Sequence, residues 1–108
     1  MVTDDEVQLA VDYLRDSSPK IGAARMDVQR SESMIKHIEA LMFLASTRSS
    51  VDAKKAEARA SERWIEAVEK HAVAVGEFEK LKGYREAAAA KLEVWRTMSA
   101  NLRGLRAL

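Results

Sequence analysis

The chain has 108 residues, which suffices for one domain, and its composition is 47% hydrophobic, 32% charged and only 6% aromatic, with one proline and four glycines. This composition is typical of long helices and coiled coils and disfavours β-strands. The lack of cysteine excludes disulfides and thiolate chemistry, and a net charge of +1 excludes binding to nucleic acid through overall charge alone.

The first predicted helix covers residues 4–16. Thr3 and Glu6 have the three-residue spacing of a capping box, and apolar residues follow at helical spacing. Ser18 and Pro19 then match an N-cap followed by the first residue of a helix. We therefore expect one helix to end at Asp16 and a second to begin at residue 19.

The second predicted helix covers residues 19–46 and carries a coiled-coil heptad. Four apolar residues recur seven apart, namely Ile21, Val28, Ile35 and Met42. Small or apolar residues fill the complementary positions of the heptad, so this side of the helix should be buried. The polar run over residues 46–50 predicts the reversal of the chain.

The third predicted helix covers residues 50–103 and begins at a second capping signature, Ser49 with Asp52. Apolar residues follow at steps of three and four along its whole length. Those assigned to an interface are Trp64, Val68, Phe78, Leu81, Leu92, Trp95 and Leu102. Gly76 and Gly83 are the weak points, since glycine costs roughly 1 kcal/mol relative to alanine in a helix interior.

These elements predict an all-α fold in a single domain over residues 1–108. A short N-terminal helix precedes a long, coiled-coil-like helical hairpin. The third helix is much longer than the second, so the second can cover only part of it. Much of the apolar stripe of the third helix would therefore be exposed to solvent in a monomer. We therefore expect a homo-oligomer, a dimer or higher, in which the hairpins form a helical bundle.

No residues show the spacing of a catalytic, cofactor or metal site. His37 and His71 lack the Glu-x-x-His pattern, and the glycines are scattered rather than gathered in a phosphate loop. We predict that the protein is not an enzyme and binds no cofactor. The acidic N-terminus and the lack of a long apolar run predict a cytoplasmic protein with no membrane segment.

Charge is distributed unevenly along the chain. Residues 1–16 carry five acidic side chains against one basic, whereas residues 80–108 carry seven basic against two acidic. A helical wheel brings four cations of the tail close together, Lys82, Arg85, Arg96 and Arg103. This basic stripe would either pair with the acidic N-terminal segment or follow a nucleic-acid backbone.

The C-terminal third resembles small helical proteins encoded by tailed bacteriophages and prophages. In that group a run of Ala-Ala-x-x-Lys, aliphatic, Glu, aliphatic, Trp-Arg-Thr recurs, and Ala87–Thr97 carries it here. Residues 59–63 and 13–16 also look similar, while Gly83 stands where the group has a bulky residue. The resemblance implies a phage origin, hence the cytoplasm of a host cell, and an association with phage replication or recombination.

The leading functional hypothesis is a non-enzymatic phage-type interaction protein that forms a homo-oligomer and binds another phage or host protein. One alternative is a DNA-associated accessory protein of phage recombination or replication. A second alternative is an inhibitor that blocks a host defence complex through shape and charge.

Overall fold

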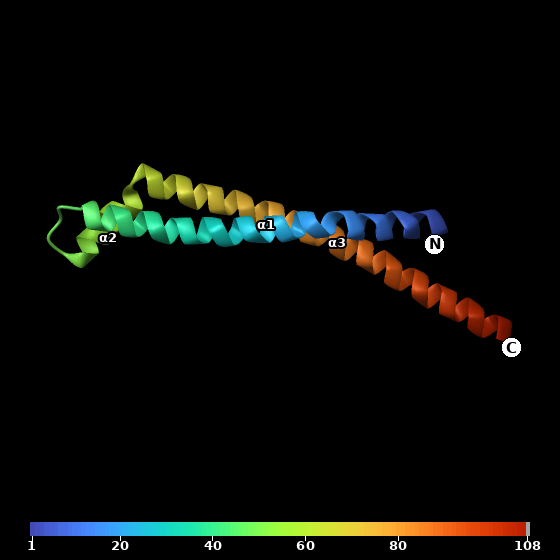
Figure 1. Cartoon of the computed structure of the whole chain (residues 1–108). Coiled ribbons are helices and arrows are strands. Elements are labelled where there is room, and N and C mark those ends of the chain that lie inside the picture. Colours follow the sequence, from blue (N-terminus) through green and yellow to red (C-terminus); the bar gives the residue numbers. More distant parts are fainter. Residues whose placement is uncertain (108) are drawn as a thin grey trace. The chain divides into compact units, whose positions relative to one another are not determined.

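The computed structural model describes residues 1–107, which form three α-helices and no strand (Figure 1). Helix α1 spans Asp4–Ala45, α2 spans Val51–Ala60 and α3 spans Glu62–Ala107. The predicted all-α class is therefore confirmed. None of the three helices has an apolar stretch of the length that a lipid bilayer requires.

Helix α1 begins at the predicted capping box. The backbone N–H of Glu6 donates to Thr3 Oγ1 at 3.2 Å, and the backbone N–H of Thr3 donates to Glu6 Oε2 at 3.3 Å. Two amides that the first helical turn leaves without partners are satisfied in this way.

The predicted helix end at Asp16 is wrong, because α1 continues through Pro19. Apolar positions recur every seven residues on both sides of the proline, so one half-buried face of the helix continues from Val7 to Met42. Pro19 lies on the opposite, exposed face. Ser18 does not cap a new helix, since its Oγ donates to the carbonyl of Leu14 at 3.0 Å within the same one.

The interior proline leads to a stability prediction. Replacing Pro19 with alanine should raise the free energy of unfolding by about 2 kcal/mol, because proline costs ~3 kcal/mol in a helix interior and its stiffening of the unfolded chain offsets up to ~1 kcal/mol. Urea unfolding followed by circular dichroism measures this change. A decrease in stability would indicate that Pro19 begins a separate helix after all.

The chain reverses at the predicted place, since residues 46–50 are not helical. Ser50, rather than Ser49, caps α2 by accepting from the N–H of Ala53 at 3.1 Å. The predicted single helix over residues 50–103 is interrupted at Ser61, whose Oγ accepts from the N–H of Trp64 and so caps α3. Gly83 does not break α3, which is continuous to Ala107.

Contacts divide the chain into two units, which we describe separately. The terminal unit comprises Met1–Gly22 and Glu79–Leu108, and the central unit comprises Ala23–Phe78. In the terminal unit Asp4 contacts Trp95 and Leu14 contacts Arg85, so its two helical segments are antiparallel. In the central unit α2 lies beside the end of α1, where the guanidinium of Arg59 binds Glu39 at 2.7 Å (Figure 1).

Candidate interaction surfaces

The helices meet along a seam that consists mainly of small side chains. Among the described residues the buried hydrophobic ones are Ala10, Ala24, Ile38, Ala58, Ala67 and Ala88. Alanine lets two helix backbones approach closely but removes little apolar area from water. Most of the large apolar side chains therefore lie at the edges of the seam, where they stay partly in contact with solvent.

The residues predicted to form an interface lie along these edges. Ten of them are half-buried, namely Ile21, Val28, Ile35, Met42, Trp64, Val68, Phe78, Leu81, Leu92 and Trp95. Leu102 differs, since it is 52% exposed. Packing within the chain leaves each of these side chains with surface that a partner can cover.

The seam of the terminal unit contains a polar layer built around Arg85. Its Nη1 donates to Ser17 Oγ at 2.6 Å and to the carbonyl oxygen of Leu14 at 2.8 Å. Ser17 is only 2% exposed, which makes it the buried polar residue of the described chain. Arg85 thus faces α1, and the structure separates it from the rest of the predicted basic stripe.

The central unit contains a second polar layer, in which Ser31 Oγ and His71 Nδ1 share a hydrogen bond of 2.9 Å. His71 is half-buried in the seam. Ser31 follows Ser17 by two heptads, and Arg85 follows His71 by the same interval. Sequence analysis did not identify these four residues as a set, although the shared spacing of 14 residues was the available signal.

The other cations of the basic stripe remain on the surface. Arg96 pairs with Glu93 of its own helix at 2.8 Å, and Lys82 and Arg103 are exposed. On the acidic segment, Asp12 and Asp16 pair with Arg15, and the hydrogen bond with Asp16 is the main cause that raises the pKa of Arg15. A hydrogen bond connects the acidic segment, residues 1–16, with the basic segment, residues 80–108: the indole N–H of Trp95 donates to Asp4 Oδ1 at 3.4 Å.

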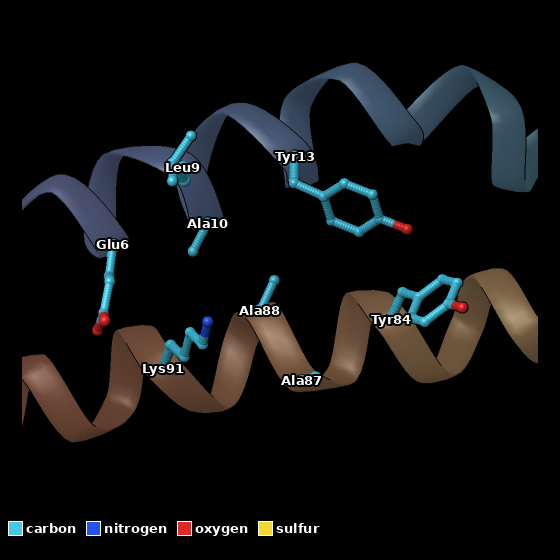
Figure 2. A pocket seen from close by; sticks show the side chains of 8 residues that line it. All are labelled: Glu6, Leu9, Ala10, Tyr13, Tyr84, Ala87, Ala88 and Lys91. Atoms are coloured by element: carbon cyan, nitrogen blue, oxygen red, sulfur yellow. The ribbon is translucent and has the colours of Figure 1, made fainter. Parts of the chain in front are cut away.

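A groove of about 300 Å³ lies between the two helical segments of the terminal unit, and we call it the terminal groove (Figure 2). Its eight lining residues are Glu6, Leu9, Ala10, Tyr13, Tyr84, Ala87, Ala88 and Lys91. Figure 2 shows Ala10 and Ala88 facing each other across the gap, with the two tyrosines on one side of this pair and Glu6 and Lys91 on the other. The groove is apolar at its centre and charged at one end.

Comparison with known protein families, with curated proteins and with solved structures finds no match to this chain.

The exposed apolar side chains are the most informative feature of these surfaces. On the central unit Met34, Leu41 and Leu44 lie on one side of α1, and the last is 79% exposed. On the terminal unit the exposed apolar residues include Leu9, Tyr84 and Val94. Among the described residues, no three His, Cys, Asp or Glu side chains gather in a group that could hold a metal ion.

Proposed function

We propose that the protein is a non-enzymatic helical interaction module, which forms a homo-oligomer and in that form binds another protein. The main support is the contrast between its core and its surface. The buried hydrophobic residues are alanines with one isoleucine, whereas leucines, methionines, valines and a tyrosine are exposed. Exposed apolar side chains that gather on one side of a helix, as Met34, Leu41 and Leu44 do on α1, are typical of surfaces that a protein partner covers.

The polar layers support the same proposal. Arginine and histidine within a helical seam reduce the apolar area that the chain buries by itself, yet they favour one register of the two helices. A module of this kind obtains a defined shape from its own hairpin contacts and gains further stability when a partner covers it. The likeness of Ala87–Thr97 to proteins of tailed bacteriophages makes a phage or host protein the partner that we propose.

A DNA-associated role has less support from the described contacts. Two cations of the basic stripe are engaged within the chain, since Arg85 binds Ser17 and Leu14 and Arg96 binds Glu93. A phosphate backbone would have to compete with these contacts, so we expect no submicromolar, salt-sensitive DNA binding near physiological salt.

The oligomer is tested by measuring the mass in solution. Light scattering after size exclusion should give at least twice the 12.1 kDa of the chain at micromolar concentration. The mass should fall on dilution if the copies exchange, because association depends on concentration. A single 12.1 kDa species at all accessible concentrations would refute the proposed homo-oligomer.

A further inference from the structure

We propose that the terminal groove is the face through which two copies of this chain associate. The two copies lie with their terminal units side by side and related by a two-fold axis parallel to the helices. This inference rests on the proposed homo-oligomer and adds to it the surface, the occupant and the orientation.

The side chains that line the groove suit contact with a second pair of helices. Its floor is formed by Ala10 and Ala88, both buried, so no bulky side chain keeps another helix away. Leu9 is 69% exposed and Tyr84 is 56% exposed, and both line the groove. Each copy thus offers large apolar side chains at the edge of a shallow hollow, which is the arrangement by which four-helix bundles interdigitate.

The charges of the groove indicate a second copy and fix its orientation. Glu6 on α1 and Lys91 on α3 lie at the same end of the groove, and Tyr13 and Tyr84 lie at the other end (Figure 2). A two-fold axis parallel to the helices places α1 of each copy against α3 of the other and brings like ends together. Glu6 then faces a lysine and the tyrosines face tyrosines, so both contacts are complementary.

The opposite orientation has neither advantage. If the axis were perpendicular to the helices, the charged end of one copy would cover the aromatic end of the other. The charges would then be desolvated against tyrosines without an opposite charge from the other copy, which is costly in an interface.

Single cysteine variants test this arrangement, because the chain has no cysteine of its own. Leu9 is next to Ala10 on α1, and Ala87 is next to Ala88 on α3, so both lie at the same position along the groove. The proposed axis therefore brings Leu9 of one copy beside Ala87 of the other. Leu9→Cys mixed with Ala87→Cys should give a disulfide-linked dimer with a mild oxidant such as diamide. Each variant alone should give several-fold less disulfide-linked dimer. Self-linking of Leu9→Cys that exceeds the mixed product would overturn the proposed orientation.

A charge placed in the groove tests the surface itself. Leu9→Lys should weaken the dimer by at least about tenfold, since it replaces a large apolar side chain of the groove edge with a charge that the interface would have to desolvate. Leu44→Lys is the matched control, being an exposed leucine of α1 in the central unit, and it should leave the dimer unchanged. Circular dichroism would show that both variants remain helical.

The results separate the two proposals. A monomeric wild-type protein refutes the homo-oligomer and this inference with it. An oligomer that forms equally well with Leu9→Lys refutes only the terminal groove as its interface.

Discussion

Replacing Ile38 with aspartate should unfold the central unit. Ile38 is the one large apolar side chain among the buried hydrophobic residues, with 8% exposure. A carboxylate there loses the packing of the isoleucine and has to be desolvated, so we expect a loss of at least ~4 kcal/mol. Circular dichroism at 25 °C should show a large loss of helix, and thermal melts should show the lost cooperative transition.

Two milder variants control for this effect. Ile38→Val removes one methylene group and should cost about 0.5–1.5 kcal/mol without loss of the fold. Leu44→Asp introduces the same charge on the same helix at a side chain that is 79% exposed, and it should change stability by less than about 0.5 kcal/mol. A similar loss for Leu44→Asp and Ile38→Asp would mean that Leu44 is covered and that the seam does not lie at Ile38.

The heptad in the first half of the chain could be predicted from sequence because it is apolar and regular. Ile21, Val28, Ile35 and Met42 all lie on the half-buried face of α1, as their spacing of seven requires. The capping box of Thr3 and Glu6 was equally predictable, since it depends on neighbours in the sequence.

Pro19 shows where local signals fail. Ser18 and Pro19 match a helix start, and a rule limited to a few residues favours a boundary there. The heptad that crosses this site and the packing of α1 in the terminal unit outweigh the local cost of the proline. Tertiary contacts of this kind cannot be predicted from the dipeptide alone.

The buried face of α3 was predicted only in part because two of its positions are polar. A search for apolar residues passes over His71 and Arg85 and accepts Leu102, which is 52% exposed. The observed buried and half-buried face of α3 follows a strict period of 3.5 residues from Trp64 to Trp95. It is found from sequence when this period is kept even where the residue is polar. The terminal groove could not be predicted, because it depends on which turn of α1 faces which turn of α3.

The polar layer of the terminal unit should respond to mutation as a pair. Arg85→Leu removes a charged donor from Ser17 Oγ and from the carbonyl of Leu14, and hydrogen bonds to charged groups contribute about 1.5–3 kcal/mol each. We expect the free energy of unfolding of this variant, measured with urea, to fall by about 3 kcal/mol. Arg96→Gln, which removes only an exposed ion pair with Glu93, should lose ~0–1 kcal/mol.

The double variant decides whether the layer stabilises the fold or specifies its register. Ser17→Ala combined with Arg85→Leu replaces both partners with apolar groups, so no buried hydroxyl is left without a partner. The free energy of unfolding of this double variant should therefore fall by much less than the sum of the two single losses. If the layer specifies register, this double variant should keep its helix content but give mixed products in cysteine cross-linking between α1 and α3. Additive losses in the double variant would show that Ser17 and Arg85 act independently and would contradict the polar layer.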